Sequence, residues 1–173
     1  KRQHQSEKEQ QVKHLKVESY LQLLIKTDKK STTLKDIQGK IWKEGYTTGR
    51  ITSELFEDAH ENLKRWHKQG YKLSVYSSGS VEAQHLLYKY TNKGDIENLF
   101  SHWFDTHIGN KKEPSSYTEI ASVMGCKPQN ILFISDNSDE CDAARSAGLS
   151  LSLIHISEPT RRYAISYAVF CLK

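Results

Sequence analysis

Two strand-like segments of this sequence end in residues suited to bind phosphate and a metal ion. The apolar run 71–76 stops at Ser77-Ser78-Gly79-Ser80, where a helix is predicted to begin. Backbone N–H groups at a helix start lack partners within the helix, and small residues let an anion come close. The second run, 131–135, ends at Asp136, whose carboxylate suits a hard divalent cation. Phosphate plus metal is therefore the first hypothesis.

Each of these residues also has an ordinary structural interpretation. Ser77 and Ser78 could belong to a serine-rich turn in which Ser80 caps the helix. Asp136 could equally cap the helix that follows it. The residue types alone leave these alternatives open.

A pair of lysines supplies the positive charge that such a site needs. Lys111 and Lys112 follow a short predicted strand at 103–106. Exposed lysine pairs are usually solvated surface, so neither residue is informative in isolation. Together with the serine hydroxyls and Asp136, however, a lysine completes a set suited to phosphoryl transfer.

The order of the elements predicts how these residues meet. Strands at 71–76, 103–106 and 131–135 alternate with helices at 81–90, 116–124 and 139–147. This alternation predicts an α/β fold with a parallel sheet and helices on its faces. Ligands bind such sheets at the carboxyl ends of the strands, so we expect Ser77, Lys111 and Asp136 to share one rim.

Helices are also predicted before the first strand. A helix should start near Thr33, with Asp36 in its first turn, and end at Gly45. A second should run from about Asp58 to Gly70. These helices would precede the α/β region rather than belong to its alternation.

Composition excludes several classes of protein. The net charge of +4 is modest, and the basic residues form no stripe with aromatics, so nucleic-acid binding is not expected. Apolar runs stay well short of the roughly 18 residues that span a bilayer, so no membrane partner is expected. Cys126, Cys141 and Cys171 have no paired spacing, which favours a reducing, cytoplasmic compartment.

The chain carries the marks of an internal fragment. Its single methionine is Met124, and it opens on Lys1-Arg2-Gln3-His4 without the apolar stretch of a secretory signal. We therefore expect it to be a piece of a longer protein.

A family resemblance covers the chain from about Leu34 to Gly148. It rests on Gln38-Gly39-Lys40-Ile41-Trp42-Lys43-Glu44-Gly45-Tyr46, on Tyr76-Ser77-Ser78-Gly79-Ser80-Val81-Glu82-Ala83-Gln84, on Phe104-Asp105-Thr106-His107-Ile108-Gly109-Asn110-Lys111, and on 131–136 with Asp142-Ala143-Ala144. These segments closely resemble enolase-phosphatase (acireductone synthase), a methionine-salvage family of the haloacid dehalogenase superfamily.

The resemblance implies a fold and a domain division. The core, at 57–148, would be a Rossmann-like α/β domain of the haloacid dehalogenase type with a parallel sheet. Residues 1–56 would form part of a helical cap over the site. Residues 149–173 match no part of the family and resemble translated sequencing-adapter read-through, although they could supply a further strand.

The resemblance also implies roles for the site residues. Ser77 and Ser78 would bind the substrate phosphate, Lys111 rather than Lys112 would be the site lysine, and Asp136 would bind Mg²⁺. The substrate implied is the small molecule 2,3-diketo-5-methylthiopentyl-1-phosphate, which the family enolises and dephosphorylates. A monomer is expected, in the cytoplasm and with the nucleus as a second compartment.

Two departures from the family are serious: the unrelated residues after 148, and the absence of the family's first motif. In the family, the nucleophilic aspartate is the first residue of an Asp-x-Glu-Gly-Thr motif that follows a strand, and this sequence lacks that motif. Two segments match it in part, Asp36-Ile37-Gln38-Gly39 and Asp95-Ile96-Glu97-Asn98, but neither follows an apolar strand. We therefore expect no catalytic nucleophile and no activity in this chain. Without the first core strand, an apolar sheet edge should be exposed.

Two other functions remain open from the sequence. A different phosphatase or dehalogenase of the superfamily would share the core. A binding module without catalysis, built on the same scaffold, would fit a chain that lacks the nucleophile.

Overall fold

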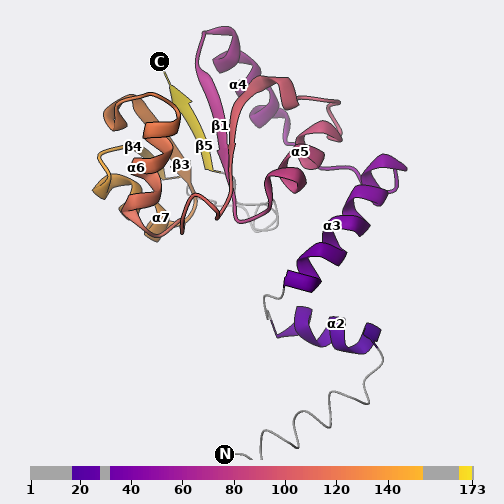
Figure 1. The fold of residues 1–173 in the computed structure, drawn as a ribbon. Coiled ribbons are helices and arrows are strands. Elements are labelled where there is room, and N and C mark those ends of the chain that lie inside the picture. The colour runs from indigo at the N-terminus through magenta and orange to yellow at the C-terminus, as the bar shows by residue number, and fades with distance from the viewer. Residues whose placement is uncertain (1–16, 28–31, 154–167, 173) are drawn as a thin grey trace, which may run out of the picture. The chain divides into compact units, whose positions relative to one another are not determined.

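A computed structural model gives the fold and describes residues 17–27, 32–153 and 168–172. The chain divides into two compact units, Lys1–Gly45 and Tyr46–Lys173 (Figure 1). The described part of the first unit is helical, and the second unit holds the sheet. The boundary between cap and core after residue 56 stays a prediction.

The first unit contains α2 (Val17–Lys26) and most of α3 (Thr32–Thr47). The predicted end of the second of these helices at Gly45 is wrong, because it continues to Thr47. The ring of Tyr46 stacks on that of Tyr90, with centroids 5.8 Å apart, and its hydroxyl shares a 2.8 Å hydrogen bond with Ser53. Packing of Tyr46 thus outweighs the low helix propensity of glycine.

The second unit alternates helices and strands, as the sequence predicts. Its elements are α4 (Glu57–Lys68), β1 (Lys72–Tyr76), α5 (Val81–Lys89), η1 (Glu97–Leu99), β2 (Phe100–Phe104), α6 (Pro114–Val123), η2 (Pro128–Asn130), β3 (Ile131–Ser135), α7 (Ser138–Ser146), β4 (Ser150–Leu153) and β5 (Ala168–Leu172). β2 ends at Phe104 rather than at 106. The Asp105 carboxylate accepts the His107 N–H at 2.9 Å, and this turn ends the strand.

The sheet has the strand order β2-β1-β5-β3-β4. β1 and β2 pair in parallel, as do β3 and β4. β5 lies antiparallel between β1 and β3, and the backbone of Val169 is in register with both Val75 and Ile134. The α/β class is therefore confirmed, and the expectation of a wholly parallel sheet needs correction at β5.

The expectation of an exposed apolar edge beside β1 or β3 is wrong. β1 pairs with β2 and β5, and β3 pairs with β5 and β4, so both strands have partners on two sides. The residues after 148 supply both β4 and β5, which confirms that this segment forms strand. The edge strands of the sheet in the described part of the chain are β2 and β4. The position between β1 and β3 is occupied by the single strand β5.

Apolar side chains are buried on both faces of the sheet, as in parallel sheets covered by helices on two sides. One cluster joins α6 and α7 to the sheet through Tyr117, Ile120, Phe133 and Cys141. The other lies under α4 and α5 and includes Leu63, Leu73, Val75 and Tyr88. These helices thereby hold the carboxyl ends of the strands in place. None of the helices in the described part of the chain has the length and apolar character needed to cross a membrane.

Candidate functional site

The loop after β1 forms a tight turn lined with serines. Ser77 is buried, and its N–H donates to the Phe104 carbonyl of β2 at 3.0 Å. The Ser77 hydroxyl accepts the Gly79 N–H at 3.2 Å, while Ser80 caps α5 by accepting the Ala83 N–H at 3.3 Å. Ser78 is exposed. Ser80 therefore caps the helix, as the ordinary structural interpretation of this turn has it.

Gln84 holds this loop against β2 from the first turns of α5. Its side chain is buried, and Nε2 donates to the carbonyls of Gly79 and Phe104, each at 2.9 Å. One amide therefore ties the serine loop to the end of the neighbouring strand. The sequence analysis gave Gln84 no role, although its position four residues after the cap was a usable signal, since it places both residues on one helix face.

Asp105 is a second support that the sequence analysis missed. One carboxylate oxygen accepts the Val81 N–H at 3.3 Å, and the other accepts the His107 N–H at 2.9 Å and lies 2.8 Å from Nδ1 of His107. Burial alone raises the pKa of Asp105, but these hydrogen bonds together outweigh it, so the pKa lies below its usual value. Its position directly after a strand, like that of Asp136, was the available signal.

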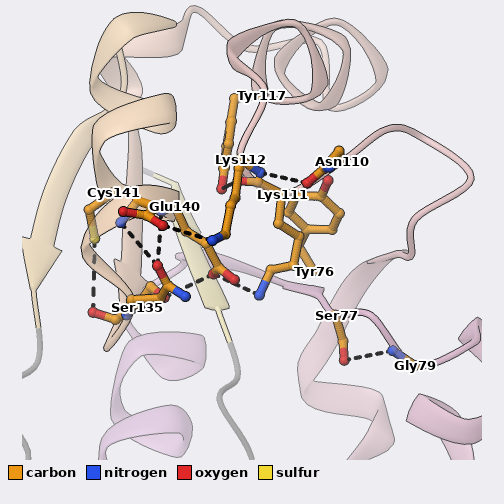
Figure 2. Close-up of polar contacts among 12 residues, drawn as sticks. Tyr76, Ser77, Gly79, Asn110, Lys111, Lys112, Tyr117, Ser135, Glu140 and Cys141 are labelled. Atoms are coloured by element: carbon orange, nitrogen blue, oxygen red, sulfur yellow. Dashed lines mark hydrogen bonds and ion pairs between the residues drawn. The ribbon is translucent and has the colours of Figure 1, made fainter. Parts of the chain in front are cut away.

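Lys111 is buried and paired. Its Nζ lies 2.7 Å from a carboxylate oxygen of Glu140, and about a tenth of each side chain is exposed. The same oxygen accepts the Ser135 hydroxyl at 3.0 Å (Figure 2). Lys111 also lies 5.8 Å above the Tyr76 ring. The sequence analysis gave Glu140 no role. Its position in the first turn of the helix after β3 could have indicated that its carboxylate lies near the strand end.

Lys112 differs from its neighbour in every one of these respects. It is exposed and pairs with the exposed Asp139 at 2.7 Å. That carboxylate raises the pKa of Lys112. The buried cation of the pair is therefore Lys111, the residue that the resemblance selects.

Asp136 directly follows β3 and is exposed. It does not cap the next helix, because Asn137 does: the Asn137 side chain accepts the N–H groups of Asp139 at 3.0 Å and Glu140 at 3.3 Å. The ordinary interpretation of Asp136 as a helix cap is thus wrong.

The described residues contain no ready-made cluster of three or more His, Cys, Asp or Glu side chains for a metal. Asp139 and Glu140 are engaged by Lys112 and Lys111. Asp136 still fits a Mg²⁺ site of the kind completed by phosphate oxygens and water, because such sites need only one or two protein carboxylates.

The strand directions bring these residues to one end of the sheet. β5 is antiparallel to both β1 and β3, so those two strands point the same way, and β2 is parallel to β1. Ser77, Asp105 and Asp136 follow the carboxyl ends of these strands. Lys111 joins two parts of this rim, since it contacts Tyr76 before the serine loop and Glu140 after Asp136.

This combination of fold and rim has a counterpart among known families. The family described as haloacid dehalogenase-like hydrolase matches residues 4–148 of the chain. The chain belongs to this family. The match to this hydrolase family ends where the sequence analysis places the start of the unrelated segment.

Several relatives of this chain are named enolase-phosphatase E1. One from Synechococcus sp. (strain CC9902) is 82% identical over 146 residues, which cover 84% of this chain and 60% of that protein. One from Persephonella marina (strain DSM 14350 / EX-H1) is 50% identical over 135 residues, covering 78% of this chain and 59% of that protein. The chain thus spans about 60% of the length of the Synechococcus relative it matches.

A solved structure of similar fold is that of the UTR4 protein from Saccharomyces cerevisiae. It superposes with a TM-score of 0.70 and 32% sequence identity, covering 84% of this chain and 69% of the yeast chain. The fold of this chain is therefore seen in an experimental structure as well.

Proposed function

We propose that this chain is part of an enolase-phosphatase of methionine salvage that converts 2,3-diketo-5-methylthiopentyl-1-phosphate to acireductone and phosphate. The observation that carries the proposal is the 82% identity over 146 residues with a Synechococcus protein of that name. At that identity, and with the same family of fold, a shared reaction is the simplest explanation of the shared sequence.

The contacts at the rim support a role for each site residue. The Ser77 N–H is used by Phe104, but its hydroxyl accepts from Gly79 and keeps its own proton to donate to a phosphate oxygen. Ser78 is exposed at the same turn and offers a second hydroxyl. Lys111 balances the phosphate charge from a site shielded from water, where an electrostatic contact is stronger than in bulk solvent.

Asp136 is the residue that we propose to hold Mg²⁺. When bound, Mg²⁺ would neutralise charge on the phosphate and orient its oxygens. The carboxylate of Asp136 lies directly after β3 and outside the helix cap made by Asn137.

We also propose that these 173 residues bind phosphate without hydrolysing the ester. The sequence contains no Asp-x-Glu-Gly-Thr motif, and of its two partial matches Asp36 lies inside α3. Loss of a covalent nucleophile lowers turnover by about 10⁶-fold in other enzymes. The small-molecule substrate, the monomeric state and the cytoplasmic or nuclear location are further parts of this proposal, with no nucleic-acid or membrane partner.

Phosphate binding tests the site residues. We would titrate inorganic phosphate with Mg²⁺ into the chain and follow binding by calorimetry, comparing Ser77→Ala, Lys111→Met and Asp136→Asn with the matched control Lys112→Met. We expect the first three changes to weaken binding about tenfold or more and the control to leave it unchanged. Equal loss in Lys111→Met and Lys112→Met would contradict the assignment of Lys111.

Hydrolysis tests the reaction. We would assay phosphate release from 2,3-diketo-5-methylthiopentyl-1-phosphate by this chain alone and by a hybrid that adds the part of the Synechococcus relative it does not match. Activity confined to the hybrid, and removed by Asp136→Asn, would support the proposal. Turnover of unrelated phosphate esters only would indicate another phosphatase of the family, and phosphate binding with a hybrid inactive on every ester would indicate a binding module.

A further inference from the structure

The backbone around Lys111 is held by side-chain hydroxyls at consecutive positions. Tyr76 donates to the Gly109 carbonyl at 2.9 Å, Ser116 to the Asn110 carbonyl at 2.8 Å, and Tyr117 to the Lys111 carbonyl at 2.6 Å. We call Tyr76, Ser116 and Tyr117 the hydroxyl clamp. Every carbonyl from 109 to 111 therefore accepts a hydrogen bond from a residue outside the loop.

The hydroxyl clamp is built from buried groups. Tyr76 and Tyr117 have no exposed surface, and Ser116 is 2% exposed. Burial raises the pKa of both tyrosines, so their hydroxyls stay protonated and remain donors throughout the neutral range. Loss of a hydroxyl donor removes a hydrogen bond from a loop carbonyl in this buried site, which is costly, although the Asn110 carbonyl also accepts the Glu113 N–H at 3.0 Å. The hydroxyl clamp thus restrains the backbone of residues 109–111.

Gly109 lets the loop come this close to α6. Its φ is 145°, and a Cβ at this position would lie 2.1 Å from the Ser116 hydroxyl oxygen. A residue with a side chain would therefore push the loop away from Ser116 and break the bond to Asn110. The close approach and the clamp are parts of one arrangement.

Tyr76 links this arrangement to the phosphate loop. It is the last residue of β1, directly before Ser77, and its hydroxyl reaches Gly109 while its ring lies under the Lys111 ammonium group. We therefore expect a change at Tyr76 to alter how the serine loop and the lysine lie relative to each other. Figure 2 shows Lys111 between Glu140 and Tyr76, with Ser77 below Tyr76.

We propose that Tyr76, Ser116 and Tyr117 are positioning residues for phosphate binding, which hold residues 109–111 so that the Lys111 ammonium group faces an anion bound at Ser77 and Ser78. This inference rests on the proposed function for its ligand, a phosphate group. It adds that the position of Lys111 is set by the hydrogen bonds to its loop backbone as well as by its ion pair with Glu140.

Removing single hydroxyl groups from the 173-residue chain tests the proposal. Tyr117→Phe and Tyr76→Phe keep the rings and delete one donor each, and Ser116→Ala deletes the third. Tyr88→Phe is the matched control, because Tyr88 is equally buried but lies in the cluster under α5. We expect each clamp variant to weaken binding of inorganic phosphate about five- to tenfold, while the control binds like the unchanged chain.

A second measurement needs no ligand and separates this inference from the proposed function. The ¹H–¹⁵N signal of the Lys111 ammonium group, recorded without phosphate, should shift or broaden in Tyr117→Phe and Tyr76→Phe but not in Tyr88→Phe. An unchanged Lys111 signal in folded clamp variants would overturn the inference. Absence of phosphate binding in the unchanged chain, with the Lys111 signal still sensitive to the clamp, would instead count against the proposed function.

Fold integrity is checked in the same samples. Far-UV circular dichroism and thermal unfolding identify any variant that has lost its structure. If Tyr117→Phe unfolds, Tyr76→Phe provides the decisive comparison, because the Asn110 carbonyl bonded by Ser116 also accepts the Glu113 N–H at 3.0 Å. A weakening of phosphate binding by Tyr76→Phe without loss of structure supports the clamp, and unchanged binding contradicts it.

Discussion

Lys111 and Lys112 are neighbours in sequence, yet the structure places them in opposite surroundings. Lys111 is buried, pairs with the buried Glu140 and sits in a loop held by the hydroxyl clamp. Lys112 is exposed and pairs with the exposed Asp139 at the same distance of 2.7 Å. Two ion pairs of equal length can therefore differ widely in how much their loss changes the stability of the fold.

The difference lies in solvent rather than in geometry. Water screens the exposed pair, and exposed pairs add little to stability. The buried pair has lost its hydration, so each partner depends on the other and on Ser135 for compensation. We expect changes around Lys111 to be costly and matched changes on the exposed side to be nearly silent.

The largest effect should come from breaking the buried pair. Lys111→Met leaves the Glu140 carboxylate buried without its cation, and we expect a loss of about 3–5 kcal/mol in the free energy of unfolding. Urea unfolding measures this. Lys112→Met should leave the midpoint unchanged, and Lys111→Met with Glu140→Leu should recover most of the loss. Similar losses in the two single lysine variants would remove the basis of the comparison.

The next effect should come from the glycine that lets the loop approach α6. Gly109→Ala meets both a positive φ and the Ser116 hydroxyl, so we expect a loss of about 2–4 kcal/mol. Gly125→Ala is a matched control, because Gly125 has a φ of 64° but open space at the Cβ position. It should cost about 1 kcal/mol. Equal losses by urea unfolding would show that contact with Ser116 is unimportant.

A buried carboxylate should also give a pH signature that an exposed one lacks. The pKa of Asp105 is lowered in the folded state, so its contribution to stability is present above the unfolded pKa of about 3.9 and is lost as pH falls through the folded value. Asp105→Asn should cost about 1–2 kcal/mol at pH 7 and flatten the loss of stability below about pH 4. Unfolding curves from pH 7 to pH 2 test this, with Asp142→Asn, in an exposed pair with Arg145, as the control. An unchanged acid dependence in Asp105→Asn would contradict it.

The smallest effect should come from removing a buried hydroxyl that makes no hydrogen bond among the described residues. The Ser74 side chain is fully buried in β1, and its oxygen has no hydrogen-bond partner among the described residues. Ser74→Ala should therefore be neutral or stabilising by up to about 1 kcal/mol, whereas loss of the Tyr117 hydroxyl should destabilise. Thermal unfolding of the two variants compares them directly. Destabilisation by Ser74→Ala would reveal a partner for this hydroxyl.

Much of the fold could be predicted because it follows from local patterns. The alternation after residue 70 predicts the order of strands and helices, and 131–135 matches β3 residue for residue. One error depends on a distant contact, because α3 continues past Gly45 where Tyr46 packs on Tyr90. The other is local: β2 ends early because Asp105 closes a turn with His107, two residues further along the chain. Only the first contact is invisible in local sequence.

The candidate site was predicted in its parts but not in its connections. Ser77, Ser78, Lys111 and Asp136 follow strand ends, which the pattern of elements makes visible. Gln84, Asp105 and Glu140 were missed because each has a partner far away in the chain, namely Phe104 for Gln84, Val81 for Asp105 and Lys111 for Glu140. Whether the four predicted residues bind substrate and metal stays a prediction for the phosphate titration to test.

The sequence by itself determined the α/β class, the family resemblance and the positions of the strand ends, because hydrophobic periodicity, turn residues and ordered motifs are local properties. Only the tertiary structure decided which lysine is buried, which hydroxyls hold its loop, and that β5 lies antiparallel between β1 and β3. The physical reason is that burial and pairing depend on segments far apart in the chain. Those segments meet only once the sheet and its helices have packed.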